Sequence, residues 1–242
     1  MTAKTIYLAR RNPATTYEEF VENWRQHAVL SGSFPDVGAR FDSVVQCKRV
    51  TEPLADSLAL TQDFDGANLL GLKSLFDAVD VYNQEGIPTL RQDERRVFSD
   101  YVSESSLTGV EHILLDGERG QVVLLTLVRR RPGTDLRTFF LAWTGDHAKR
   151  LADTEGYRTR VRRHTQTLIV LPTPPGWGYD GVGELWFDDV ASAARFLEET
   201  GDLAAGPELG GGLTTLLELS HVWVRRPPRR PDDPTTTSGD SR

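Results

Sequence analysis

The sequence predicts an α+β fold made of two units, each with the order β-α-β-β-α-β. Two observations indicate it. Short apolar stretches alternate with amphipathic ones, and a set of residues near the N-terminus recurs in the same order about 119 residues later. Each unit should form a four-stranded antiparallel sheet with both helices on one face. We expect the two sheets to close into one barrel within the chain, because closure removes exposed sheet edges.

The internal repeat can be followed residue by residue. Leu8, Arg10, Arg11, Pro13, Thr15, Phe20 and Trp24 match, in this order, Leu127, Arg129, Arg130, Pro132, Thr134, Phe139 and Trp143. Further along, Asp65-Gly66 matches Asp180-Gly181 at a smaller offset, as expected of a duplicated unit whose second copy has shorter loops. We therefore assign residues 1–115 to the first repeat and 121–226 to the second. Residues 227–242, rich in Pro, Asp and Thr, are expected to form a disordered tail.

The first repeat is expected to contain four strands and two helices. Strands are predicted at 5–9, 40–50, 64–72 and 110–115, helices from about 16 to 31 and from 74 to 83, and a loop at 86–93. Thr15 or Thr16 should cap the first helix, because a hydroxyl there accepts a hydrogen bond from a free backbone N–H group. In the second helix, Phe76 and Val79 are expected to face inward.

The second repeat should follow the same plan. Strands are predicted at 122–128, 158–171, 182–187 and 218–225, and helices at 135–153 and 190–199. Within the long second strand, Arg158, Arg160 and Arg162 would share one face. That face is either solvated or suited to an anionic ligand, which matches the geometry of a guanidinium group.

Composition and charge exclude several classes of protein. The formal net charge of −7 argues against a general nucleic-acid binder. Cys47 is the one cysteine, so no intrachain disulfide can form. The N-terminus lacks the apolar core of a signal peptide, and no apolar run approaches the roughly 20 residues that span a bilayer. We expect a soluble, cytoplasmic protein. The sequence leaves open whether two chains associate as a homodimer.

Each repeat places two aromatic residues and a histidine on one face of its first helix. Phe139, Trp143 and His147 stand four residues apart, so they share a helical face. In the first repeat the equivalent residues are Phe20, Trp24 and His27, with spacings of four and then three residues. These two faces are the strongest candidates for chemistry.

The candidate catalytic residues are His147 and His27, with Asp180 and Asp65 as orienting partners. An unperturbed imidazole has a pKa near 6.5, and burial among aromatic rings favours its neutral form, which suits a general base. The alternative is a core histidine that bonds to a backbone carbonyl. Each aspartate starts the third strand and could orient the helix histidine. Alternatively, Asp-Gly simply forms a turn.

Further residues are candidates for substrate contact because they are aromatic or because they are histidines on strands that alternate between faces. The complete set is Trp143, Trp24, Phe139, Phe20, Tyr179, Trp186, His164, His221 and His112. His112 and His221 occupy matching places on the closing strands. No metal site is expected, since the histidines lack short-range ligand spacing.

The chain resembles the EthD family of the dimeric α+β barrel superfamily, whose units are ferredoxin-like. The residues that carry the resemblance are the helix with Phe139, Trp143 and His147-Ala148, the strand at 179–187, and Asp93-Glu94 followed by Phe98-Ser99-Asp100. The first repeat departs from the pattern, because its Trp24–His27 spacing is one residue shorter. The resemblance implies a small cofactor-free enzyme of natural-product or catabolic pathways, such as a polyketide cyclase or dehydratase. Related barrels include quinone-forming monooxygenases and haem-binding proteins.

We therefore expect a cofactor-independent enzyme with a hydrophobic, polyketide-derived or aromatic substrate. His147 or His27 would remove a proton next to a carbonyl and promote cyclisation, dehydration or isomerisation. The substrate cavity should lie between a sheet and its own helices, and the second repeat is expected to hold the better preserved site. Two alternatives remain open: a protein that binds haem or another hydrophobic ligand, and a cofactor-free, quinone-forming monooxygenase.

Overall fold

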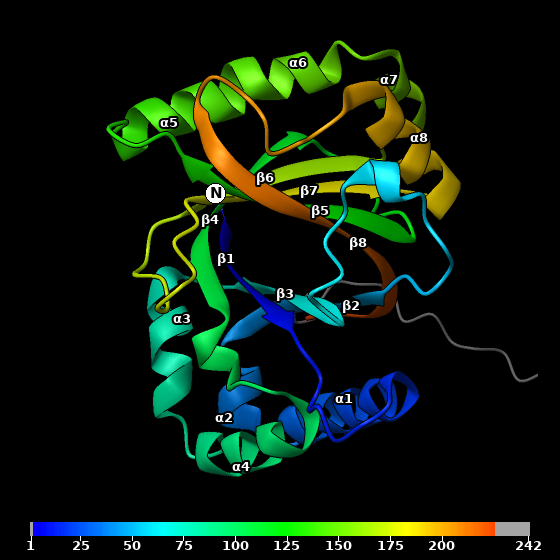
Figure 1. Cartoon of the computed structure of the whole chain (residues 1–242). Coiled ribbons are helices and arrows are strands. Elements are labelled where there is room, and N and C mark those ends of the chain that lie inside the picture. Colours follow the sequence, from blue (N-terminus) through cyan, green and yellow to red (C-terminus); the bar gives the residue numbers. More distant parts are fainter. Residues whose placement is uncertain (1, 226–242) are drawn as a thin grey trace, which may run out of the picture.

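The structure, a computed structural model, describes residues 2–225. Its centre is a closed antiparallel barrel of eight strands, so the predicted closure of the sheets is confirmed (Figure 1). The strands are β1 (Thr2–Ala9), β2 (Phe41–Arg49), β3 (Gly66–Leu72), β4 (Ser106–Leu115), β5 (Val122–Arg130), β6 (Arg163–Ile169), β7 (Gly181–Phe187) and β8 (Leu209–Val224). The predicted tail at 227–242 lies outside the described residues.

The barrel has the order β1-β3-β2-β8-β5-β7-β6-β4 and closes between β4 and β1. Each half of the chain contributes four neighbouring strands, and the halves meet where β2 pairs with β8 and β4 with β6. Side chains alternate between the barrel interior and the helices. Ile6 and Leu8 thus belong to the interior cluster, whereas Tyr7 belongs to a cluster that contains residues of the first helix.

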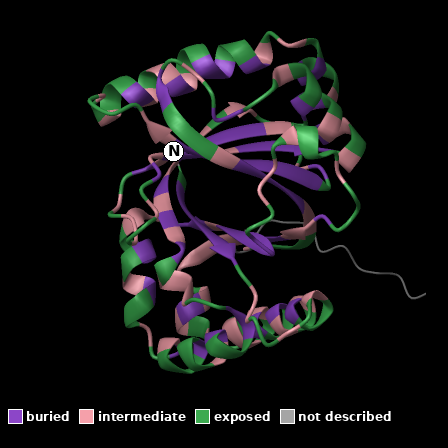
Figure 2. Ribbon diagram, viewed as in Figure 1, coloured by how far each residue is buried: buried purple, intermediate pink, exposed green. Residues whose placement is uncertain are grey.

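Helices cover the barrel on two opposite sides (Figure 1). The first half provides α1 (Tyr17–Gly32), α2 (Pro35–Gly38), α3 (Leu75–Asp80) and α4 (Ile87–Val97), and the second half α5 (Leu136–Ala142), a π-helical turn (Trp143–His147), α6 (Ala148–Ala152), α7 (Glu155–Arg160) and α8 (Val190–Thr200). Thr16 caps α1 in a capping box with Glu19. Buried residues follow the strands and the inner faces of the helices (Figure 2). No helix between residues 2 and 225 combines the length and apolar character needed to cross a membrane.

The π-helical turn accounts for the different spacing of the two aromatic-histidine series. Trp24 and His27 are three residues apart in regular helix α1, whereas Trp143 and His147 are four apart and span the π turn. A π turn accommodates one extra residue without breaking the helix. The π turn therefore accommodates the additional residue of the second half, and both His27 and His147 are buried.

Two predictions for the first half were wrong. The segment predicted as a loop at 86–93 forms most of α4, because Pro88 occupies the first turn, where its missing N–H group costs nothing. Leu90 and Val97 of α4 are buried. In α3, Phe76 and Val79 are exposed rather than inward, and Ala78 faces the core instead.

The predicted row of three arginines on one strand was also wrong. Arg158 and Arg160 lie in α7, and β6 starts only at Arg163. Arg160 pairs with Glu199 of α8, and Arg162 pairs with Asp188. Arg160 therefore ties α7 to α8, and Arg162 ties the start of β6 to the end of β7.

Candidate functional site

A cavity of about 760 Å³ lies between the helices of the first half and its sheet. Its floor is formed by β1, β3, β2 and the end of β8, and its roof by α1, α2 and α4. Most of its wall is apolar: Val37, Val44, Leu70, Leu72, Val81, Ile87 and Leu90. Both the volume and this lining are typical of a site for a small organic molecule.

A row of polar side chains crosses the floor of this cavity. The strand register pairs Ser106 with Tyr7, Tyr7 with Asn68, Asn68 with Gln46, and Gln46 with His221. All five line the cavity. Because the last of them comes from β8, the second half of the chain completes the floor beneath the helices of the first.

The Tyr7 hydroxyl is the centre of this row. It accepts a hydrogen bond from Trp24 Nε1 at 3.1 Å and one from Asn68 Nδ2 at 2.5 Å. Burial raises the pKa of Tyr7 well above its usual range, so the phenol stays protonated at neutral pH. With both acceptor positions filled, its own O–H remains available to donate.

Two amides beside Tyr7 have buried polar atoms without a hydrogen-bond partner among residues 2–225. They are Asn68 Oδ1 and Gln46 Nε2, in side chains that are 7% and 4% exposed. Leaving a buried polar group unsatisfied costs about 1–3 kcal/mol. Since both residues line the cavity, a bound molecule with oxygen-containing groups could satisfy them.

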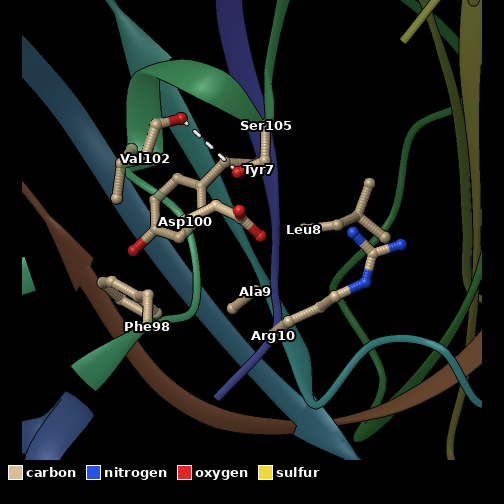
Figure 3. Close-up of a pocket in the computed structure, with 8 residues that line it drawn as sticks. All are labelled: Tyr7, Leu8, Ala9, Arg10, Phe98, Asp100, Val102 and Ser105. Atoms are coloured by element: carbon tan, nitrogen blue, oxygen red, sulfur yellow. Dashed lines mark hydrogen bonds between the residues drawn. The ribbon is translucent and has the colours of Figure 1, made fainter. Parts of the chain in front are cut away.

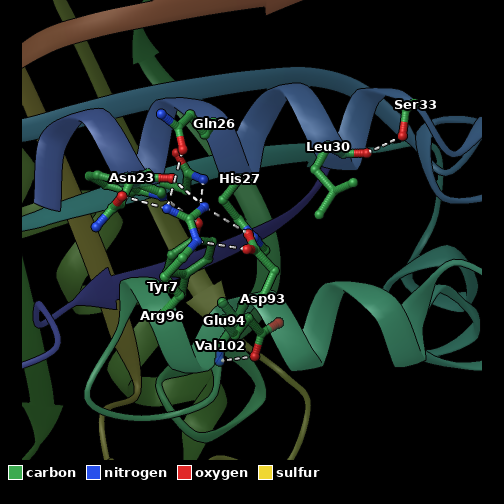
Figure 4. A network of polar contacts seen from close by, with 12 residues as sticks. Tyr7, Asn23, Gln26, His27, Leu30, Ser33, Asp93, Glu94, Arg96 and Val102 are labelled. Carbon is green, nitrogen blue, oxygen red and sulfur yellow. Dashed lines mark hydrogen bonds and ion pairs between the residues drawn. The ribbon is translucent and has the colours of Figure 1, made fainter. Parts of the chain in front are cut away.

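His27 of α1 forms a dyad with Asp93 of α4 at the roof of the cavity (Figure 4). Its Nδ1 lies 2.9 Å from Asp93 Oδ2, which leaves Nε2 as the nitrogen available to a ligand. Burial lowers the pKa of His27, although Asp93 opposes this, so the imidazole is neutral at pH 7. Burial also acts to raise the pKa of Asp93, but hydrogen bonds from Arg96 and His27 hold it below its usual range.

Glu94 follows Asp93 directly and also lines the cavity. One of its oxygens, Oε2, accepts a hydrogen bond from the backbone N–H of Val102 at 3.1 Å (Figure 4). Burial raises the pKa of Glu94, which that hydrogen bond only partly offsets. A buried carboxyl group whose pKa is raised in this way is a candidate for proton transfer.

A second, much smaller pocket is also lined by Tyr7 (Figure 3). It has a volume of about 10 Å³ and is lined by Phe98, Asp100, Val102 and Ser105 among others. This is room for about one water molecule. The pocket is therefore too small to hold a substrate.

His147 of the π turn and His164 of β6 are buried in the second half and do not line this cavity. His147 Nδ1 lies 3.2 Å from Glu208 Oε1 and 3.0 Å from Arg150 Nη2. His164 Nδ1 lies 3.0 Å from the Tyr157 hydroxyl. Burial, with the neighbouring imidazole of His147, lowers the pKa of His164 to about 3.

The other predicted aromatic residues and histidines lie in several different places. Trp24, His27 and His221 line the cavity. Five others pack elsewhere: Phe20 behind Trp24, Phe139 and Trp143 between α5 and the second sheet, and Tyr179 and Trp186 in the barrel interior. His112 contacts the ring of Phe140, with ring centroids 6.0 Å apart.

The two predicted orienting aspartates contact arginines rather than histidines. Asp65 accepts hydrogen bonds from the backbone and the guanidinium group of Arg11. Asp180 accepts one from the backbone N–H of Arg130 and lies 3.4 Å from its Nε. Both carboxylates therefore anchor the end of the first strand of their half, and Asp93 fills the orienting role at His27.

Sequence reasoning missed Tyr7, Gln46, Asn68 and Glu94 as site residues. Tyr7, Asn68 and Gln46 come together only through strand pairing, which no local pattern indicates. Asp93-Glu94 did carry the resemblance to the EthD family. Their role was hidden because the segment preceding them was predicted to be a loop.

The EthD domain model matches residues 131–205, so the resemblance is confirmed for this part of the second half. No curated protein sequence matches the chain. Similar solved structures include an anthrone oxidase-like protein (12% identity, 92% of each chain covered, TM-score 0.55). A mutant chlorite dismutase from Candidatus Nitrospira defluvii (12%, 91% of each chain, 0.52) and a "putative monooxygenase" from Lactobacillus acidophilus (8%, 92% of this chain and 95% of that one, 0.53) are also similar. At these identities the likeness shows the fold alone.

Proposed function

We propose that the protein is an enzyme that binds a hydrophobic, oxygen-containing molecule in the cavity of the first half and removes a proton next to a carbonyl. The observation that carries this proposal is the His27–Asp93 dyad at the roof of a largely apolar cavity. The site therefore differs from the one expected in the second repeat, where His147 is engaged by Glu208 and Arg150.

His27 acts as the general base. Asp93 accepts a hydrogen bond from Nδ1–H and so fixes the tautomer in which Nε2 carries the lone pair. Because burial lowers its pKa, the imidazole is already in its basic form at neutral pH. A bound carbon acid in the cavity lies beside this nitrogen.

Tyr7 stabilises the negative charge that develops on the substrate oxygen. Hydrogen bonds from Trp24 and Asn68 to the Tyr7 oxygen orient the phenol, and its own O–H donates to the enolate. The Nε2 group of Gln46 is a second donor in the same row. Glu94, whose pKa is raised by burial, returns a proton when the reaction requires one.

The reaction after proton removal is a cyclisation, dehydration or isomerisation in our first proposal. A cofactor-free oxygenation, in which the same carbanion reduces O₂, is the second candidate. The support for it is the fold shared with an anthrone oxidase-like protein and with a structure described as a monooxygenase. Both candidates use the same base and the same cavity.

Anthrone, a tricyclic ketone with an acidic methylene group, is a suitable probe. Under nitrogen in D₂O, we expect the wild-type protein to accelerate exchange of the methylene hydrogens, and His27→Ala to lose this acceleration. His147→Ala is the matched control and should retain it. Oxygen uptake with the same probe in air then separates an oxygenase from a cyclase or isomerase. Exchange at the wild-type rate in folded His27→Ala contradicts the role of His27.

Haem is a second candidate ligand of the same cavity. The observation that favours it is that His27 lines a space of about 760 Å³ while its Nδ1 is engaged by Asp93, so Nε2 of His27 would be the atom that holds the haem iron. Bound haem would supply redox chemistry at its iron, and Asp93 would make the His27 nitrogen more electron-rich. Titration with haemin distinguishes this role, since a Soret shift that His27→Ala abolishes supports haem and its absence contradicts it.

The two halves are proposed to derive from one duplicated ferredoxin-like unit. Supporting this, each half supplies four strands in the same order, and the π turn absorbs the one residue by which the two helix series differ. The first copy would then hold the substrate cavity, while the second closes the barrel and supplies β8 to the cavity floor.

A further inference from the structure

A second polar region of the cavity lies along the end of β8. His221, Trp223 and Arg225 are alternate residues, so their side chains lie on one side of the strand, and all three line the cavity. His221 ends the polar row that contains Tyr7. Arg225 lies four residues further on, which is about 13 Å along an extended strand.

The guanidinium group of Arg225 is held in place by backbone carbonyls, with no carboxylate partner among residues 2–225. Its Nε donates to the carbonyl oxygen of Phe41 at 3.1 Å, and its Nη2 donates to that of Gly38 at 2.7 Å. Between residues 2 and 225, no carboxylate lies within ion-pair distance of this guanidinium group, and Nη1 has no acceptor. Within the described residues, the side chain is thus oriented by backbone carbonyls and has no carboxylate partner.

Arg25, the other arginine that lines the cavity, has a different environment. It forms two hydrogen bonds to Glu22, at 2.9 and 2.7 Å, and this pair is well exposed. Among residues 2–225, Glu22 and Glu94 are the carboxylates that line the cavity. Glu22 is engaged by Arg25, and Glu94 by the backbone of Val102. Neither offsets the charge at the end of β8.

Gln46 adds an independent indication of a ligand. Its side chain is 4% exposed, lines the cavity, and leaves Nε2 without a partner among the described residues. Since Gln46 pairs with His221 in the strand register, this unsatisfied donor lies at the start of the same segment of β8. A ligand that reaches from the polar row to Arg225 passes across Trp223.

We propose that the molecule bound in this cavity is an aromatic acid whose carboxylate pairs with Arg225 and whose ring system lies against Trp223. This inference rests on the proposed function and specifies its substrate class. A planar guanidinium group binds a carboxylate through parallel N–H···O bonds, and an indole offers a flat surface to an aromatic ring. The acid group lies about 13 Å from the polar row, since that distance separates Arg225 from His221 along the strand.

Competition for a fluorescent reporter tests the proposal. N-phenyl-1-naphthylamine, which is neutral, fluoresces when it enters an apolar cavity. Anthracene-9-carboxylate and its methyl ester then serve as competitors that share a ring system and differ in charge. We expect the acid to displace the reporter at a lower concentration than the ester. Arg225→Gln should weaken displacement by the acid about tenfold and that by the ester less than twofold.

The control variants separate the possible outcomes. Arg25→Gln should change neither competitor by more than twofold, and Leu70→Trp, which fills the cavity, should abolish reporter binding. The assignment of Arg225 is wrong if the reporter binds normally but Arg225→Gln leaves displacement by the acid unchanged. It is also wrong if Arg25→Gln weakens displacement by the acid as much as Arg225→Gln does. In both cases the proposed function stands. If Leu70→Trp leaves reporter binding intact, the cavity is not the binding site and both proposals fail.

Discussion

The indole ring of Trp24 packs directly on the backbone of Gly66, so closely that a Cβ atom on Gly66 would lie 2.5 Å from Cζ3 of the ring. Trp143 and Gly181 have the same relationship in the second half, at 2.4 Å. The Asp-Gly pairs that start β3 and β7 therefore have a packing role. Their glycine clears space for a helix tryptophan, while the aspartate anchors the neighbouring strand end.

Gly66→Ala should destabilise the protein by about 1–3 kcal/mol, because the added methyl group displaces Trp24 or the carbonyl of Cys47. Urea unfolding measures this cost. Gly181→Ala should cost a similar amount. Since Trp24 lines the cavity and Trp143 packs away from it, only Gly66→Ala should also weaken binding of N-phenyl-1-naphthylamine. Equal losses of binding in both variants would contradict this distinction.

Replacement of Asp93 should change the pH dependence of catalysis. A base is active when neutral, so the rate falls as the pH drops through the pKa of His27, which burial holds below 6.5. Asp93 raises this pKa, so Asp93→Asn should move the acidic limb of the pH–rate profile to lower pH. Loss of orientation should also lower kcat about tenfold to a hundredfold.

Arg96→Gln removes a positive charge beside the His27–Asp93 dyad, whereas Asp93→Asn removes a negative one. The cation of Arg96 lowers the pKa of His27, so its removal should move the acidic limb to higher pH. Shifts in the same direction for both variants, or no shift in either, would show that His27 is not the group that titrates. Hydrogen exchange into anthrone, measured between pH 4 and 8, provides the profile.

Glu94 should destabilise the folded protein at neutral and alkaline pH. Burial raises its pKa, so its contribution to stability is complete below the pKa of the unfolded chain, near 4.3, and is lost as the pH rises through the folded value. Glu94→Gln should therefore raise the free energy of unfolding at pH 8 and change it little at pH 4. The exposed Glu104→Gln is the control and should show no such difference. If Glu94 handles a proton in the reaction, the stabilised variant is also slower.

The sequence was sufficient to predict most strands, because their apolar stretches are short and bounded by Pro, Gly and charged residues. It also predicted α1, whose capping residues and amphipathic face are local signals. Helix α4 was missed because it is mostly polar and carries Pro88. The row of Tyr7, Asn68 and Gln46 depends on the register of three strands that are distant in sequence, and no periodicity within one strand encodes that register.

The interior of the barrel contains one more feature that depends on distant pairing. Lys4 of β1 bonds to Glu111 of β4 at 2.7 Å and to Glu184 of β7, and all three side chains are buried. Trp186 Nε1 donates to Glu184 Oε2 at 3.2 Å. This group links the two halves of the chain across the barrel.

Lys4→Met should cost about 3–5 kcal/mol at pH 7, because it leaves two buried carboxylates without their cation. Burial acts to raise the pKa of Glu111, but Lys4 holds it below its usual range. The stability that Lys4 provides is therefore present above the pKa of the unfolded chain and lost as the pH falls through the folded value. The difference in unfolding free energy between wild type and Lys4→Met should thus shrink from pH 7 to pH 3.

Adding Glu111→Gln and Glu184→Gln to Lys4→Met should recover part of the loss at pH 7, since no charge is then buried alone. A Lys4→Met variant as stable as the wild type at pH 7 would show that the barrel interior tolerates both carboxylates unpaired.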